Sequence, residues 1–134
     1  MKSKEIVRQF CDLAAKRDPD LLRPLLADDV VYQNVGMAPV AGVDNVIANL
    51  ASQFEMFPDT YEFETINCVG EGDVVMNERL DKLAGPNGIS LALPVMGTFV
   101  VRDGKIARWT DYWDSGLIAK MMAGDDCTAL VPAY

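Results

Sequence analysis

The 134-residue sequence predicts an α+β fold in which one strongly curved sheet, mixed or antiparallel, wraps around helices from the N-terminal part of the chain. Two observations predict this class. Apolar residues recur at helical spacing in much of the first 57 residues, whereas residues 61–113 alternate between long strand patterns and turn signals. Helices followed by an antiparallel meander are typical of α+β proteins. Packing one face of the sheet against the helices leaves a cone-shaped cavity, which suits a small apolar ligand.

Three helices are expected in the first part of the chain. Ser3 is expected to cap a first helix that runs to about Lys16 and has one apolar stripe. Asp18 and Pro19 predict the cap and the first residue of a short second helix. A third helix is expected over residues 43–57. The side chains expected to face inward are Ile6, Val7, Phe10, Leu13 and Ala14, then Leu21, Leu22, Leu25 and Leu26, and finally Val46, Ile47, Leu50, Phe54 and Phe57.

Strand patterns precede and follow the third helix. Strands are expected over residues 29–34, 61–69, 74–83, 89–102 and 106–113. Asp103 and Gly104 give the strongest hairpin signal, and Pro94 is expected to bend or bulge its strand. Ser115 is expected to cap a final short helix that runs through Met122.

Length and charge limit the classes of function. Residues 1–134 are long enough for one domain with a real core, and 50% of them are hydrophobic. The net charge of −8 argues against binding to nucleic acid or to anionic membranes. No apolar run approaches the roughly 20 residues that span a bilayer. The N-terminal residues predict an amphipathic helix rather than a signal peptide, so a cytoplasmic location is expected.

The chain has no histidine, and this removes whole classes of chemistry. Ser-His-Asp and Cys-His catalysis are impossible, and zinc or non-haem iron sites are disfavoured. Cys11, Cys68 and Cys127 form no CxxC pair, and no phosphate-binding glycine motif occurs. We therefore expect no metal and no cofactor. Acid–base chemistry must fall to carboxylates, tyrosine, lysine or cysteine.

Three groups of polar residues interrupt otherwise apolar strands. Tyr32 and Asn34 are two residues apart, as are Arg79 and Asp81, so each pair shares one face of its strand. Asp111 lies in the last strand. If these faces form the inside of the sheet, the site contains two carboxylates, a guanidinium, a phenol and an amide. Buried charge is costly without a partner, so such a cluster is either a structural ion pair or a reaction centre.

The residues alone leave plainer alternatives open. Arg79 and Asp81 could form a salt bridge on the outer face of the sheet, where it would contribute little. Trp109 and Trp113, which share the strand face of Asp111, could be ordinary core aromatics.

The segments Tyr32–Asn34, Glu78–Leu83, Gly104–Ile106 and Trp109–Asp114 together resemble the limonene-1,2-epoxide hydrolase family. The resemblance covers essentially the whole chain in the same order of elements. It implies the cone-shaped nuclear transport factor 2-like, or SnoaL-like, fold that this family shares with ketosteroid isomerase.

The resemblance also implies a role for each polar residue. Asp111 would be the base that takes a proton from water, and Tyr32 and Asn34 would hold that water. Asp81 would give a proton to the epoxide oxygen, while Arg79 would bind both carboxyls. Two ionised aspartates and one arginine leave the cluster with one negative charge. An apolar cavity therefore favours one retained proton, which the two acids titrate as a coupled pair.

The implied substrates are water and a small, apolar, cyclic epoxide, and the implied product is a trans diol. A homodimer is also expected. The candidates for the apolar walls are Leu83, Leu93, Val95, Met96, Phe99, Trp109 and Trp113. The alternatives are a ketosteroid isomerase-like enzyme, a polyketide cyclase-like enzyme, and a non-catalytic module that binds small ligands. Arg79 would have no role in the isomerase scheme, which needs one carboxylate base and an oxyanion hole.

Overall fold

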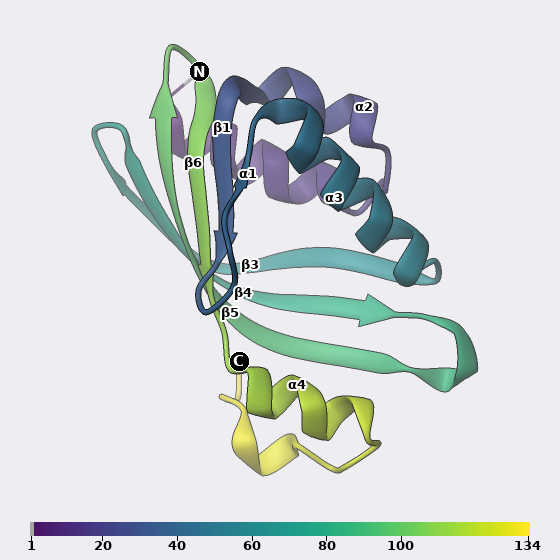
Figure 1. Ribbon diagram of the computed structural model, residues 1–134. Helices are drawn as coiled ribbons and strands as arrows, with labels where there is room; N and C mark the ends of the chain where they lie inside the picture. Colours follow the sequence, from purple (N-terminus) through teal and green to yellow (C-terminus); the bar gives the residue numbers. More distant parts are fainter. Residues whose placement is uncertain (1) are drawn as a thin grey trace.

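The computed structural model describes residues 2–134, which form four α-helices and one six-stranded mixed sheet (Figure 1). The helices are α1 (Ser3–Ala14), α2 (Pro19–Leu22), α3 (Val43–Met56) and α4 (Ser115–Met122). The strands are β1 (Leu26–Asn34), β2 (Val40–Ala41), β3 (Thr60–Glu71), β4 (Val74–Ala84), β5 (Ser90–Arg102) and β6 (Lys105–Tyr112). The predicted α+β class is confirmed. Among the described residues, no helix has the length and apolar character that crossing a membrane requires.

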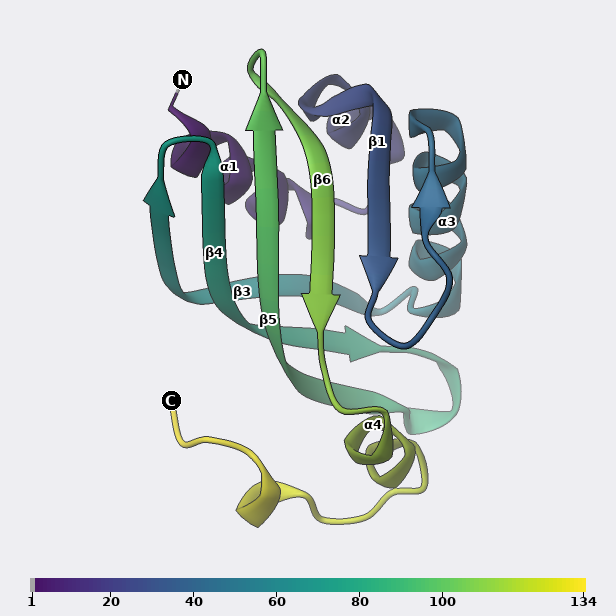
Figure 2. The same cartoon turned by 60° about the vertical axis from the view of Figure 1, so that its left-hand side comes forward.

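The sheet is open, and its strand order is β2-β1-β6-β5-β4-β3. Strands β3 to β6 form an antiparallel meander, whereas β1 lies parallel to β6. This parallel pairing sets Asn34 opposite Asp111 and Tyr32 opposite Trp109. Strands β3, β4 and β5 curve strongly, so the sheet wraps partly around the helices (Figures 1 and 2).

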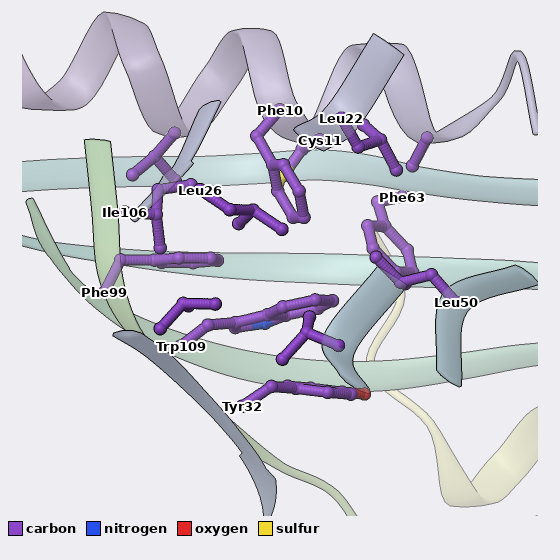
Figure 3. Packing of buried hydrophobic residues seen from close by; sticks show 14 of the residues in the cluster. Phe10, Cys11, Leu22, Leu26, Tyr32, Leu50, Phe63, Phe99, Ile106 and Trp109 are labelled. Carbon is purple, nitrogen blue, oxygen red and sulfur yellow. The ribbon is translucent and has the colours of Figure 1, made fainter. Parts of the chain in front are cut away.

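Helices α1 and α3 cover the concave face of the sheet, and α4 lies near one end of β5 (Figure 2). Trp109 is fully buried at the centre of the core. Its ring stacks on Tyr32 with 3.8 Å between centroids, and the Phe10 ring meets it edge-on at 5.0 Å (Figure 3). Phe99 lies nearly parallel to the same indole at 6.1 Å. Because aromatic rings of this size bury much apolar surface, the layer anchors α1, β1, β5 and β6 to one another.

The helix caps partly correct the sequence prediction. The Asp18 carboxylate accepts a hydrogen bond of 3.0 Å from the Asp20 backbone N–H, which confirms this cap. Ser3 and Ser115, in contrast, are the first residues inside α1 and α4, and neither caps its helix. Asp114 caps α4 instead, since its carboxylate accepts from the Leu117 N–H at 3.0 Å. Serine and aspartate are both good cap residues, so a sequence that offers them side by side does not decide between them.

Three other local expectations differ from the structure. Leu21, expected to face inward, is 40% exposed because the turn of α2 directs Leu22 to the core instead. The edge strand β2 is an additional element that pairs with the end of β1. Pro94 pairs with Leu80 in a register that has no shift, so the expected bulge is absent, although β5 curves strongly (Figure 2). Pro94 lies beyond the end of β6, so β5 has a neighbour on only one side there, and the missing N–H is tolerated.

Candidate active site

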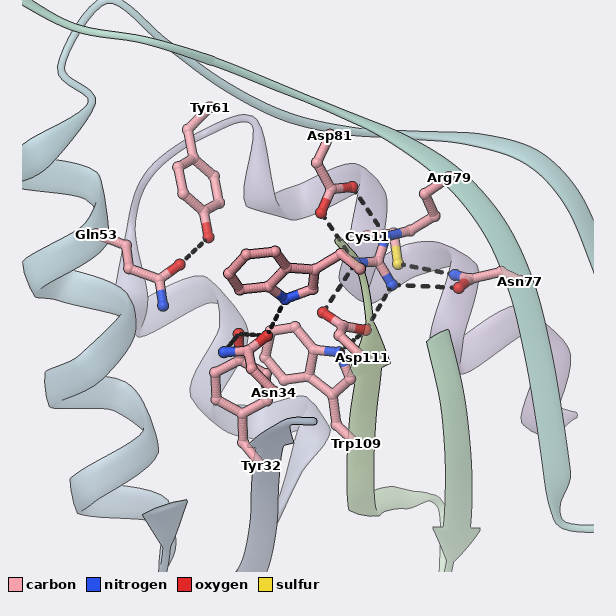
Figure 4. Close-up of polar contacts among 11 residues, drawn as sticks. Cys11, Tyr32, Asn34, Gln53, Tyr61, Asn77, Arg79, Asp81, Trp109 and Asp111 are labelled. Atoms are coloured by element: carbon pink, nitrogen blue, oxygen red, sulfur yellow. Dashed lines mark hydrogen bonds and ion pairs between the residues drawn. The ribbon is translucent and has the colours of Figure 1, made fainter. Parts of the chain in front are cut away.

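The polar residues from three separate strands meet on the concave face of the sheet (Figure 4). Strand β4 contributes Arg79 and Asp81, β6 contributes Asp111, and β1 contributes Tyr32 and Asn34. Each pair points to the same side because side chains alternate along a strand. The structure therefore brings together all five residues that the sequence singled out as candidate catalytic groups.

Arg79 is at the centre of the cluster and has no exposed surface. Its guanidinium binds Asp81 through Nε and Nη2, with two hydrogen bonds of 3.0 Å each. It binds Asp111 through Nη1 at 3.0 Å and Nη2 at 2.9 Å. The second hydrogen of Nη1 goes to Asn77 Oδ1 at 3.2 Å, so all five N–H groups have an acceptor. The guanidinium also lies over the Phe63 ring, 4.7 Å from its centroid.

Two residues that support Arg79 were missed by the sequence prediction. Asn77 is buried behind the guanidinium, and its amide Nδ2 also contacts Cys11 Sγ at 3.5 Å. Gly97 lies between β4 and β6, where a Cβ atom would collide with Arg79 Nη1 and lie 2.6 Å from Asn77 Oδ1 and 3.0 Å from Asp111 Oδ1. The spacing of Asn77 two residues before Arg79 is a signal that could have identified it. Gly97 gives no such signal in the sequence.

Burial separates Asp81 from an ordinary surface carboxylate. Removal from water raises the pKa of Asp81 to about 6, and the Arg79 charge and hydrogen bonds only partly oppose this shift. Burial likewise raises the pKa of the Cys11 thiol to about 12, so Cys11 stays protonated and behaves as a small apolar residue. Burial raises the pKa of Tyr32 as well, so its phenol keeps its proton.

The two indoles act as hydrogen-bond donors at this site. Trp109 Nε1 donates to Asp111 Oδ1 at 2.9 Å, and Trp113 Nε1 donates to Asn34 Oδ1 at 2.9 Å. The Asn34 amide nitrogen in turn donates to the Tyr32 hydroxyl oxygen at 3.0 Å. Asp111 and Asn34 are therefore held in fixed orientations before any ligand arrives.

A cavity of about 240 Å³ opens beside this cluster, and Tyr32, Asn34, Asp81 and Asp111 all line it. Its apolar lining includes four of the seven predicted wall residues, namely Leu83, Leu93, Val95 and Trp113. It also includes Met37, Met56, Phe57, Phe63 and Ile118, which the sequence prediction missed. Met37 comes from a loop, Met56 and Phe57 from the end of α3, Phe63 from β3 and Ile118 from α4. Only the tertiary structure reveals that these elements lie close to the site.

The prediction was wrong for the other three wall residues, Met96, Phe99 and Trp109, which do not line the cavity. Met96 lies on the outer face of β5 and is 49% exposed, because it alternates with Val95. Phe99 lies in the aromatic core against Trp109. Trp109 itself is covered on all sides and reaches the site only through its N–H.

Comparison with known proteins gives a consistent family assignment. Residues 7–109 match the family model described as a SnoaL-like domain. Over 111 residues the chain is 33% identical to the epoxide hydrolase EphG of Mycobacterium tuberculosis, a match that covers 81% of this chain and 70% of that protein.

Solved structures show the same fold. An LEH-like epoxide hydrolase from M. tuberculosis superposes with a TM-score of 0.81 at 28% identity, covering 98% of this chain and 96% of its own. A putative SnoaL-like polyketide cyclase from Jannaschia sp. CCS1 gives a TM-score of 0.80 at 21% identity, covering 92% and 93%. At that lower identity the second match shows the fold alone. The resemblance to the epoxide hydrolases that the sequence suggested is confirmed.

Proposed function

This chain belongs to the SnoaL-like domain family, and from that premise we propose that it is an epoxide hydrolase. Its substrate would be a small epoxide with a mainly apolar, cyclic skeleton, and its product a vicinal trans diol. Its similarity to EphG and to the LEH-like epoxide hydrolase supports a hydrolase of this kind. The observation on which the proposal rests is the pair of buried carboxyls, Asp81 and Asp111, that share one guanidinium and both face the cavity.

Opening an epoxide with water requires two proton transfers, and the two acids divide them. Asp111 acts as the base that removes a proton from water, and Tyr32 and Asn34 hold that water by hydrogen bonds. Asp81 acts as the acid that protonates the epoxide oxygen as the C–O bond breaks. Attack by water from the side opposite the leaving oxygen gives the trans diol from a cyclic epoxide. Neither a covalent intermediate nor a cofactor is needed in this scheme.

The electrostatics of the cluster favour this division of roles. Two ionised aspartates beside Arg79 would leave a net negative charge in an apolar cavity, whereas one retained proton makes the cluster neutral. The raised pKa of Asp81, about 6, supports Asp81 as the acid that keeps this proton. Arg79 binds both oxygens of each carboxyl, so it holds acid and base in a fixed geometry.

Isotope labelling tests the proposal. The purified protein is incubated with cyclohexene oxide and limonene oxide in oxygen-18 water under single-turnover conditions. Direct attack by water gives labelled diol in the first turnover, whereas a covalent carboxylate ester would transfer an unlabelled enzyme oxygen to the product. Asp111→Asn and Asp81→Asn are each expected to lower the rate by about 10²- to 10⁴-fold, because each removes one proton transfer.

Asp12→Asn, which neutralises an exposed carboxylate of α1, is the matched control and should keep full activity. Wild-type protein that is inert on a broad panel of epoxides but isomerises a 5-ene-3-ketosteroid would replace the proposal with an isomerase. Binding of such ligands without turnover would instead indicate a non-catalytic module.

We also propose that residues 1–134 form one domain that acts as a cytoplasmic homodimer. The outer face of the sheet, which α1 and α3 leave uncovered, presents exposed apolar side chains in neighbouring strands. Met76 pairs with Val69, and Met96 pairs with Tyr112. A second copy of this apolar face is the partner that fits it. Light scattering should give twice the chain mass for the wild type and the single chain mass for the Met76→Lys/Met96→Lys variant.

A further inference from the structure

Two polar residues in the wall of the cavity have no role in the proposed proton transfers. Gln53 comes from α3 and Tyr61 from the start of β3, and both line the cavity beside apolar neighbours such as Phe57 and Leu83. Figure 4 shows their side chains directed at each other, on the side away from Arg79. Polar groups in an apolar wall lose their hydration on burial, so their presence calls for a hydrogen-bonding partner.

The pair is held rigidly. The Tyr61 hydroxyl donates a hydrogen bond to Gln53 Oε1. Gln53 Nε2 donates in turn to Asn49 Oδ1 at 2.7 Å, one turn earlier on α3. The Tyr61 ring is 3% exposed and meets the Phe54 ring edge-on, with 4.8 Å between centroids. Burial raises the pKa of Tyr61 well above its ordinary value, so the phenol keeps the proton that it donates.

The hydrogen-bonding capacity that remains is two acceptor oxygens and the second N–H of Gln53 Nε2, whose first N–H goes to Asn49. The single proton of Tyr61 is engaged by Gln53, so the phenol oxygen has only lone pairs to offer to a ligand. Gln53 Oε1 has one lone pair left after it accepts this proton. A hydroxyl group, which both donates and accepts, therefore fits this wall. A carbonyl can pair only with the second N–H of Gln53 Nε2 and leaves the phenol oxygen without a donor. A cationic amine would also donate, but the apolar lining disfavours a charge.

We propose that Tyr61 and Gln53 recognise a hydroxyl group on the substrate, so that the preferred substrate is a hydroxylated alicyclic epoxide. The inference rests on the proposed function, because it places the epoxide against Asp81 and Asp111 and the hydroxyl against the opposite wall. An epoxide without that hydroxyl leaves the remaining lone pairs of the two oxygens without a donor in a desolvated site, and this lowers its transition-state binding.

Three cyclohexene oxides that differ only in one ring substituent, a hydroxyl, a ketone or a methyl group, test the proposal. The wild type is expected to prefer the hydroxyl over the methyl compound by at least about tenfold in kcat/KM, with the ketone in between because it pairs with Gln53 Nε2 alone. Tyr61→Phe and Gln53→Leu should each bring the hydroxyl-to-methyl ratio close to one. Asn67→Ala, at an exposed position elsewhere on β3, should leave the ratio as in the wild type. A wild-type ratio of one or less, or an unchanged ratio in Tyr61→Phe, would overturn the inference.

Affinity measurements distinguish a failure of hydroxyl recognition from a failure of the proposed epoxide hydrolase activity. The slow Asp111→Asn variant allows binding of each epoxide to be measured before turnover, and quenching of tryptophan fluorescence reports the affinity, since Trp113 lines the cavity. Tighter binding of the hydroxyl compound, lost when Tyr61→Phe is added, supports hydroxyl recognition even if the wild type hydrolyses none of the three. Hydrolysis of all three at equal rates, with equal affinities, leaves the epoxide hydrolase intact and refutes the role of Tyr61 and Gln53.

Discussion

Strand β4 contains two ion pairs of opposite character only one residue apart. On the concave face, Arg79 and Asp81 have side chains that are 0% and 9% exposed, and both also belong to the network of Asp111. On the convex face, Lys82 bonds Glu64 of β3 at 2.6 Å, with side chains that are 42% and 40% exposed. The residue types are nearly the same, and only the face of the strand differs.

The difference between the two pairs teaches how burial turns a salt bridge into a reactive group. Water screens the outer pair, so its interaction contributes little to stability. The inner pair has lost its hydration, and for Asp81 this loss outweighs the attraction of Arg79, so that its pKa rises to about 6. The inner carboxyl can therefore hold a proton near neutral pH. Four predictions test this contrast.

The largest effect is expected from Arg79→Met, which leaves two carboxyls buried without their cation. The free energy of unfolding should fall by about 3–5 kcal/mol, since an unpaired buried charge is more costly than a pair, and epoxide hydrolysis should be lost. Urea denaturation and the diol assay measure the two effects. Adding Asp81→Asn and Asp111→Asn should restore much of the stability but none of the activity. If Arg79→Met alone proved as stable as the wild type, the two buried carboxyls would not depend on the Arg79 charge.

A smaller loss, of about 10²-fold in kcat/KM, is expected from Gly97→Ala, because a shift of roughly 1 Å in catalytic groups has this effect. The added methyl group occupies space that Arg79 Nη1 and Asn77 Oδ1 now fill, so the guanidinium must move away from Asp111. Thr98→Ala, the next residue along β5 and directed to the other face, is the control and should retain activity. Equal activity of the two variants would show that the packing around Arg79 tolerates a displacement.

The titration of Asp81 should appear in both activity and stability. As the acid must be protonated, kcat/KM is expected to fall about tenfold per pH unit above a pH of about 6. The folded pKa lies above the unfolded value of 3.8, so the protonated carboxyl stabilises the fold at low pH. This contribution is lost as the pH rises from 3.8 through about 6. Chemical denaturation at a series of pH values should show this loss in the wild type and not in Asp81→Asn.

The smallest effect is expected from Lys82→Met on the convex face. Its ion pair with Glu64 is half in water, so kcat/KM should change by less than about twofold and the thermal midpoint should stay close to that of the wild type. Calorimetry and the diol assay provide the comparison with Arg79→Met. If Lys82→Met proved as damaging as Arg79→Met, burial could not be the cause of the difference between the two pairs.

Much of this protein follows from local patterns in its sequence. The period of two along a strand puts Arg79 with Asp81 and Tyr32 with Asn34 on common faces whatever the rest of the chain does. Helical periodicity and turn residues gave the order of the elements, with bounds that differ by a few residues, as for β1, which begins at Leu26. The absence of histidine had already confined proton transfer to other side chains.

The tertiary structure alone decided which face became the inside and what surrounds it. Nothing local in β4 distinguishes the face of Arg79 from the face of Lys82, because burial depends on where α1 and α3 pack. The parallel pairing that sets Asn34 beside Asp111 joins residues 77 positions apart. The close approach of Arg79 and Asn77 to Gly97 likewise exists only because β4 and β5 are neighbours. Gln53 and Tyr61 meet for the same reason, as α3 and β3 converge on the cavity. Strand register and burial depend on contacts between residues that are far apart in the sequence, and local periodicity does not determine those contacts.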